Sequence, residues 1–234
     1  EAMVQERFPG VKTLRMDMDT TSRKGGHEEI LAAFSAHEAD ILIGTQMIVK
    51  GHDFGNVTLV GIMAADLSLN TPDYRCSERT FQLLTQAAGR AGRGSLSGNV
   101  VIQTYQPEHY AIVTAAEQNY EEFYRREMFY RKMMNYPPAC YMEAVLFAGN
   151  NEKTVERCSD LALSTVRKMG YEENEIQMIG PVRAPVYKVN DIYRKILYIK
   201  SKNCDILDKI RRNIELLAAG DEGFKSLALQ FDIS

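Results

Sequence analysis

Short, uninterrupted apolar runs in the first half of the chain constrain its fold more than any other feature. They lie at 40–44, 57–65 and 99–104, and polar or amphipathic stretches separate them. A strand that is apolar on both faces is typical of a parallel sheet, because helices then cover both sides of that sheet. The alternation of strand and helix therefore predicts an α/β lobe built on a parallel sheet over residues 1–107.

The second half of the chain follows a different pattern. Helical sequence at 108–135 ends at Tyr136-Pro137-Pro138, which marks a predicted domain boundary. Residues 136–234 then read strand, helix, strand, strand, helix, strand. This βαββαβ order predicts a smaller α+β domain of the ferredoxin-like type.

The helical segment before that boundary carries a stripe of aromatic and methionine side chains. The stripe consists of Tyr120, Phe123, Tyr124, Met128, Phe129 and Met133. Stripes of this kind usually pack into a core, because methionine and aromatic side chains fill irregular apolar space. We therefore expect the stripe to be buried.

Composition argues against several classes of protein. With 234 residues, 45% hydrophobic and 25% charged, and without a long apolar run, the chain indicates neither a disordered nor a membrane protein. A formal net charge of -3 means that any nucleic-acid contact must be local. The four cysteines lie far apart, which argues against a metal site and fits reduced thiols in the cytoplasm. A chain that begins with Glu1 is expected to be part of a longer protein.

The stretch Thr80–Gly94 carries the strongest functional pattern. A polar face with three arginines runs along a predicted helix that ends in three glycines, where backbone can approach another group closely. The polar face consists of Arg79, Gln82, Gln86, Arg90 and Arg93. Arginine suits phosphate oxygens because its planar fork matches them and its charge is permanent. A solvated polar helix face followed by a glycine-rich loop is the alternative interpretation.

A second polar segment directly follows the apolar run at 40–44. Ligands gather at the carboxyl ends of strands in open α/β sheets, so polar groups there are well placed to act. The candidates for contacts with a nucleic-acid backbone are Thr45, Gln46 and Lys50. The candidates for a place near a nucleotide are Gly51 and Asp53. In the alternative interpretation Thr45 caps the next helix and Asp53 caps a turn.

The middle of the predicted C-terminal domain is basic. Six cations are interleaved with tyrosines and oppose a single acid, Asp191. The cations are Arg183, Lys188, Arg194, Lys195, Lys200 and Lys202. Such a segment can hold phosphates, stack bases or receive an acidic peptide of a partner. A solvated hairpin edge protected by lysines explains the pattern equally well.

Several of these motifs resemble known helicases. The arrangement Gln-x-x-Gly-Arg-x-Gly-Arg at 86–93 is similar to the sixth conserved motif of superfamily 2 helicases. Further segments stand where the PriA family of primosomal replication-restart DNA helicases has them, so that the resemblance covers essentially the whole chain. These segments are Ile43–Met47, Lys50–Phe54, Asp66–Leu84, Gln103–Tyr105, Pro107–Tyr110 and Tyr136–Pro138.

The resemblance implies an ATP-dependent 3′-to-5′ DNA helicase that acts in replication restart and primosome assembly at stalled forks. Residues 1–107 would form its second RecA-like lobe, 108–135 connecting helices and 136–234 the C-terminal domain. Gln86, Arg90 and Arg93 would face the γ-phosphate, with Arg93 as the arginine finger.

The remaining roles implied by the resemblance concern DNA and protein partners. Thr45 would contact the DNA backbone, and Gly51 and Asp53 would couple DNA to the nucleotide. The C-terminal domain would help recognise branched DNA and contact single-stranded-DNA-binding protein and other primosome proteins. Lys200 and Lys202 are the first candidates for those contacts.

The sequence departs from the family's pattern in what it lacks. It has no phosphate-binding loop, no acidic box for Mg²⁺ and no paired-cysteine zinc module. ATP and Mg²⁺ are therefore expected to bind mainly to the absent first lobe, and zinc only to the absent upstream module. We expect this chain alone not to hydrolyse ATP. Two alternatives stay open, a non-catalytic module that binds DNA or protein and a lobe of a related recombination or repair helicase.

Overall fold

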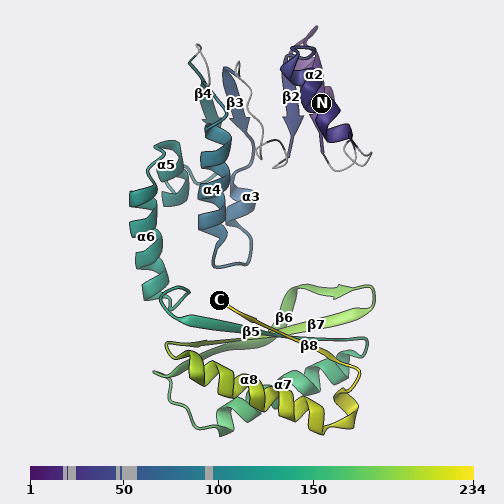
Figure 1. Ribbon diagram of the computed structural model, residues 1–234, viewed down its shortest axis with the longest axis vertical. Helices are drawn as coiled ribbons and strands as arrows, with labels where there is room; N and C mark the ends of the chain where they lie inside the picture. Colours follow the sequence, from purple (N-terminus) through teal and green to yellow (C-terminus); the bar gives the residue numbers. More distant parts are fainter. Residues whose placement is uncertain (18–19, 21–24, 46–47, 49–56, 93–96) are drawn as a thin grey trace. The chain divides into compact units, whose positions relative to one another are not determined.

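The computed structural model describes the whole chain except residues 18–19, 21–24, 46–47, 49–56 and 93–96 (Figure 1). The chain divides into two compact units, Glu1–Tyr124 and Arg125–Ser234. Among the described residues, two hydrophobic clusters form within the first unit and one within the second.

A strand-helix-strand segment opens the first unit. Its elements are α1 (Ala2–Arg7), β1 (Thr13–Met16), α2 (Gly26–Ser35) and β2 (Ile41–Gly44). Strands β1 and β2 pair in parallel, with Thr13 opposite Ile41 and Met16 opposite Gly44. Met16 and Leu31 are the buried centre of this segment, because the apolar stripe of α2 packs onto the two strands. The strand predicted at 40–44 is therefore confirmed, together with its parallel pairing.

The rest of the first unit holds a second pair of parallel strands and four helices. Its elements are β3 (Leu59–Ile62), α3 (Asp66–Leu69), α4 (Cys76–Ala88), β4 (Asn99–Ile102), α5 (Tyr110–Ala116) and the start of α6 (Tyr120–Met133). β3 pairs with β4 in parallel, Leu59 opposite Asn99. The strand expected at 57–65 is shorter because the backbone turns at Ala64, which has φ 52°, and α3 begins two residues later. In the described part of the chain the four strands form two two-stranded sheets.

Packing of α3, α4, α5 and the start of α6 builds the second cluster of this unit. The Phe81 ring stacks on the Phe123 ring with centroids 4.2 Å apart. Leu69, Leu84 and Ile112 close the cluster around them. The continuous helical segment expected at 108–135 is interrupted after α5, where Gln118 adopts φ 53°.

The expectation that the aromatic and methionine stripe of α6 is buried is wrong for most of its members. Phe123 is buried, but Tyr120, Tyr124, Phe129 and Met133 are exposed. A buried ion pair takes the inward positions of the later turns: Arg131 Nε lies 2.7 Å from Glu127 Oε1, and Arg131 Nη1 donates to the Pro137 carbonyl at 2.9 Å. Charged groups can be buried here because each is paired and hydrogen-bonded.

The second unit has the predicted order of elements. They are β5 (Tyr141–Gly149), α7 (Glu152–Lys168), β6 (Ile176–Val189), β7 (Ile192–Ser201), α8 (Cys204–Gly220), a short 3₁₀ turn η2 (Glu222–Phe224) and β8 (Ala228–Ile233). The strands form one antiparallel sheet in the order β6-β7-β5-β8. Both long helices cover the same face of this sheet (Figure 1). Asn151 and Asn203 start these helices as N-caps, accepting hydrogen bonds from Thr154 N and Asp205 N.

Alternation along the central strands decides which side chains enter the core under α7 and α8. Val145 and Phe147 of β5 and Leu197 and Ile199 of β7 are fully buried among apolar residues of both helices. Glu143 has the same parity on β5 and is only 1% exposed. The carboxyl group of Glu143 therefore lies on the face of the sheet that α7 and α8 cover.

Candidate functional site

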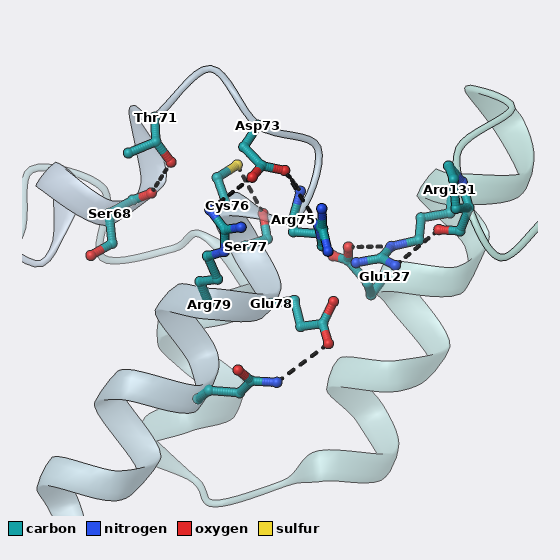
Figure 2. Close-up of polar contacts among 12 residues, drawn as sticks. Ser68, Thr71, Asp73, Arg75, Cys76, Ser77, Glu78, Arg79, Glu127 and Arg131 are labelled. Carbon is teal, nitrogen blue, oxygen red and sulfur yellow. Dashed lines mark hydrogen bonds and ion pairs between the residues drawn. The ribbon is translucent and has the colours of Figure 1, made fainter. Parts of the chain in front are cut away.

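Helix α4 presents the polar face that the sequence predicts. Thr80, Phe81, Leu84, Ala87 and Ala88 are buried on one side of the helix, and the exposed side chains on the other side are Arg79, Gln82 and Gln86. At the start of the helix Asp73 accepts a hydrogen bond from Arg75 N at 2.9 Å and pairs with Arg79 Nη1 at 2.7 Å (Figure 2). Arg79 is thus engaged within the chain.

Gln86 lies on the last turn of α4, and Arg90 lies in the turn that follows the helix. Gln86 is exposed and Arg90 is half-buried. The helix ends at Ala88, as its glycines predict, and the amide of Arg90 bonds the Ala87 carbonyl at 3.0 Å. Arg93, the predicted arginine finger, lies outside the described residues.

Close backbone approach fixes the turn that follows α4. Gly92 adopts φ 72°, and its amide donates to the Val57 carbonyl just before β3 at 3.0 Å. Gly98, just before β4, lies against the same turn, because a Cβ added there would sit 2.1 Å from Gly92 N and 2.5 Å from the Ala91 carbonyl carbon. The glycines therefore serve close packing between this turn and the entries of β3 and β4.

Thr45 lies at the predicted carboxyl end of β2 and is exposed. Its carbonyl accepts a hydrogen bond from Ile48 N at 3.1 Å. Gly44 before it is exposed but has close neighbours on one side, since a Cβ there would meet Ile48 Cδ1 at 2.4 Å and the Met16 carbonyl oxygen at 2.5 Å. The other predicted residues of this segment, Gln46, Lys50, Gly51 and Asp53, lie outside the described residues.

Asp66 is a buried carboxylate on the first residue of α3, shortly after β3. It accepts from Thr104 Oγ1 at 2.8 Å and from the Tyr105 amide at 3.0 Å. The hydrogen bond from the Tyr105 amide is the main cause that lowers the pKa of Asp66, with a further contribution from the Thr104 hydroxyl. Asp66 thus ties the ends of β3 and β4 together. These partners are 38 and 39 residues away along the chain, so the local sequence does not show them.

The six predicted cations of the C-terminal domain do not form one surface. Arg183 and Lys195 are neighbours across β6 and β7, whereas Arg194 follows the opposite parity and points to the other face of the sheet. Lys195 Nζ lies 3.9 Å from Asp160 of α7, and Lys188 Nζ lies 2.8 Å from Asp191. Acids of the second unit therefore offset two of these charges.

Two tyrosines sit beside the exposed cations of the β6–β7 hairpin. The Arg183 guanidinium lies 4.4 Å from the Tyr187 ring centroid, and Lys188 Nζ lies 4.9 Å from that of Tyr193. The Tyr187 hydroxyl donates to the Glu152 carboxylate, and that hydrogen bond raises the pKa of Tyr187. The hairpin end therefore combines positive charge with aromatic surface.

The two remaining cations differ in exposure. Lys202 is exposed after β7. Lys200 is only 4% exposed, and its ammonium donates to the Met134 carbonyl at 3.0 Å. Burial lowers the pKa of Lys200.

The described ranges carry neither a metal-binding cluster nor a membrane span. Among their residues, no group of three or more histidine, cysteine, aspartate or glutamate side chains is arranged to hold a metal ion. None of the described helices has the length and apolarity needed to cross a bilayer.

Two family models match separate parts of the chain. Residues 1–95 match the family model described as helicase conserved C-terminal domain, and residues 132–233 match the primosomal protein N C-terminal domain. Among solved structures, the de novo designed protein Foldit4 covers 41% of this chain and 96% of its own with a TM-score of 0.33 and 14% identity, a similarity too low to indicate a shared fold.

Several curated relatives carry the same name. The replication restart protein PriA of Bacillus subtilis is 44% identical over 88% of this chain, and that of Synechocystis is 42% identical over 86%. The protein of the same name from Haemophilus influenzae is 36% identical over 92% of the chain. The chain spans about a quarter of the length of the first two relatives, 26% and 24%. It carries a helicase C-terminal domain followed by a primosomal protein N C-terminal domain, and it belongs to the PriA family of replication restart proteins.

Proposed function

We propose that this chain works within a longer ATP-dependent 3′-to-5′ DNA helicase that restarts replication in the cytoplasm. In this proposal the first unit contributes the second RecA-like lobe and the second unit a ferredoxin-like C-terminal domain, with domain limits at 1–107, 108–135 and 136–234. The strand order β6-β7-β5-β8 supports the ferredoxin-like part.

The end of α4 carries the proposal. Gln86 is exposed on its last turn, Arg90 is half-buried in the turn that follows, and the backbone of that turn lies close to the residues just before β3 and β4. A guanidinium held on a rigid turn suits a phosphate whose negative charge grows during transfer, because the donor need not reorganise. We propose that Arg93, Arg90 and Gln86 face the γ-phosphate, with Arg93 as the arginine finger. ATP and Mg²⁺ would bind mainly outside this chain, as would zinc.

DNA contacts are assigned in the same proposal to the segment after β2. Thr45, Gln46 and Lys50 would hold the DNA backbone, and Gly51 and Asp53 would couple DNA to the nucleotide. The exposure of Thr45 directly after a parallel strand supports this assignment.

The hairpin end of the second unit is proposed as a contact surface for forked DNA or for primosome proteins such as single-stranded-DNA-binding protein. Arg183 and Lys188 beside Tyr187 and Tyr193 support this role, because cations next to aromatic rings suit phosphates and bases. Lys202 and Arg194 would extend the contact. Lys195 and Lys200 would act through the fold, since one is paired with Asp160 and the other is buried.

Turnover of the complete parent protein tests the proposal. Arg93→Ala should lower DNA-stimulated ATP turnover at least about 10²-fold while DNA affinity changes little, because an arginine finger acts on the transition state. Arg79→Ala is the matched control, an arginine of the same helix that pairs with Asp73, and it should leave turnover within about 3-fold, below what an arginine finger contributes. Unchanged turnover with weaker, less salt-dependent DNA binding would place the arginines on DNA and favour a non-catalytic binding module.

Hydrolysis by the 234-residue chain alone is the second measurement. We expect none above background with or without DNA. Robust turnover by this chain, lost on Arg93→Ala, would contradict the assignment of the ATP site to another part of the protein.

A further inference from the structure

The two edges of the antiparallel sheet in the second unit differ. Edge strand β6 contains Pro181 and Pro185, and its register to β7 shifts between Ile179 and Val182 and again between Arg183 and Lys188. Prolines and irregular pairing are devices by which natural sheets prevent further strands from adding. The opposite edge, β8, pairs with β5 without a shift from Ala228 to Ile233 and has no proline. Only β6 is therefore protected against strand addition.

Hydrogen-bond parity shows which groups of β8 point outward. Met142 and Ser234 exchange both backbone hydrogen bonds, each at 2.9 Å. In an antiparallel ladder such pairs recur every second residue, so Asp232, Gln230 and Ala228 also bond β5. The N–H and C=O groups of Leu229, Phe231 and Ile233 then face away from the sheet. Within the described part of the chain, these three have no backbone partner on that side.

We propose that β8 is a self-association edge, where a second copy of this chain adds its own β8 in antiparallel orientation. Because the bonding residues of both copies must be Leu229, Phe231 and Ile233, only a few symmetric registers are possible. In the register centred on Phe231, Phe231 faces its own copy and Leu229 faces Ile233 twice. Between them Gln230 faces Asp232 twice, so that each side-chain amide can donate to a carboxylate.

The neighbouring registers are less favourable. A register centred on Asp232 opposes two carboxylates directly, which destabilises a cross-strand pair. A register centred on Gln230 places each Asp232 opposite Ala228 and leaves its charge without a donor across the strand. The alternation in the segment Leu229–Ile233 thus suits an antiparallel copy of itself, with apolar pairs on one face of the joined sheet and amide–carboxylate pairs on the other.

Such an interface is expected to be weak, because one pair of short edge strands covers far less than the roughly 1,200 Å² of a stable complex. The pattern of amide hydrogen bonds along β8 nevertheless distinguishes this interface from other modes of association. Amides of Ala228, Gln230 and Asp232 are bonded to β5 in every state, whereas those of Leu229, Phe231 and Ile233 become bonded only in the pair. The proposal does not depend on helicase activity.

Amide hydrogen exchange and sedimentation of the 234-residue chain at low and high concentration test it. We expect protection of Leu229, Phe231 and Ile233 to rise with concentration while that of the three even-numbered amides stays constant. Gln230→Asp should weaken association roughly 2- to 30-fold, since it creates two carboxylate pairs, and Gln230→Lys should strengthen it by a similar factor at low salt.

Gln230 is exposed, so neither variant touches the core, and circular dichroism verifies that both are folded. A strictly monomeric chain toward millimolar concentration would overturn the proposal. Association without alternating protection on β8 would overturn it as well, because another surface would then be responsible. Weakening by Gln230→Lys would reject the register centred on Phe231.

Discussion

The ammonium group of Lys200 lies 3.5 Å from the centroid of the Tyr136 ring while it donates a 3.0 Å hydrogen bond to the Met134 carbonyl. Tyr136 and Met134 belong to the turn between α6 and β5, so a side chain of β7 holds the backbone of a turn 66 residues earlier. Cys140 Sγ donates to the Asn135 carbonyl and Arg131 donates to the Pro137 carbonyl of the same turn. Three side chains thus satisfy three carbonyl groups of one short segment.

Lys200→Met should therefore act on stability more than on binding. Methionine fills similar space but leaves the Met134 carbonyl without its donor, which costs about 1–3 kcal/mol of unfolding free energy. Urea denaturation measures the loss. Lys202→Met, an exposed neighbour, should change stability by less than about 0.5 kcal/mol. If Lys200→Met left stability unchanged and weakened DNA binding, Lys200 would be a surface contact.

Glu143→Gln should change how stability depends on pH. Burial raises the pKa of Glu143 to about 7, although Arg211 favours the charged form, and Asp208 and Glu215 on the same helix α8 add to the rise. The folded-state pKa lies above the unfolded one, so the contribution of Glu143 to stability is full below about pH 4.5 and is lost as pH rises through about 7. The loss amounts to at most about 3 kcal/mol.

Urea denaturation at pH 5 and pH 8 checks this prediction. Wild type should lose stability between the two values, and Glu143→Gln should remove most of that loss. Glu173→Gln, an exposed acid of the same unit, serves as the control and should keep the wild-type dependence. Parallel wild-type and Glu143→Gln profiles would show that Glu143 finds a cation when it ionises.

Gly98→Ala should disturb the end of α4. A Cβ at Gly98 would meet backbone atoms of Gly92 and Ala91, which cannot rotate away as a side chain can, and overpacking of this kind costs about 1–3 kcal/mol. Gly61→Ala in β3 is a matched control, because nothing lies within 4 Å of a Cβ placed there. Thermal unfolding of the two variants compares them directly, and equal melting temperatures would mean that the turn after α4 adapts freely.

Asp66→Asn should destabilise the first unit at neutral pH and matter less in acid. The pKa of Asp66 is lowered in the folded state, so its contribution is present above the unfolded pKa and is lost as pH falls through the folded one. Wild type and Asp66→Asn should therefore differ most in melting temperature at pH 7, and the difference should shrink as pH falls below about 4. A difference that persists unchanged at pH 3 would point to packing instead of charge.

The sequence predicts well whatever depends on local pattern. The βαββαβ order, the parallel pairing of β1 with β2 and of β3 with β4, and the end of α4 at its glycines follow from periodicity and from the backbone freedom of glycine. Periodicity and turn chemistry are properties of residues close together in the chain, so the local sequence suffices to predict these features.

Pattern alone does not predict which side chains are satisfied by distant groups. Lys200 reads as one more cation of a basic hairpin, and only the pairing of β7 with β5 brings it to the turn after α6. The aromatic stripe of α6 reads as core, yet Glu127 and Arg131 take the inward positions because they satisfy each other. Both differences arise from partners that the local sequence does not show.

The inward ion pair of α6 also restricts how this helix can move. Sliding α6 by one turn would displace Arg131 by about 5.4 Å and remove it from the Pro137 carbonyl, which leaves a buried guanidinium without that acceptor. A shift of α6 along its own axis, relative to the turn that carries Pro137, is thus costly in free energy. A joint movement of α6 and β5 keeps the hydrogen bond and does not have this cost. We therefore expect residues 125–149 to move together, so that a displacement of the helix also displaces β5.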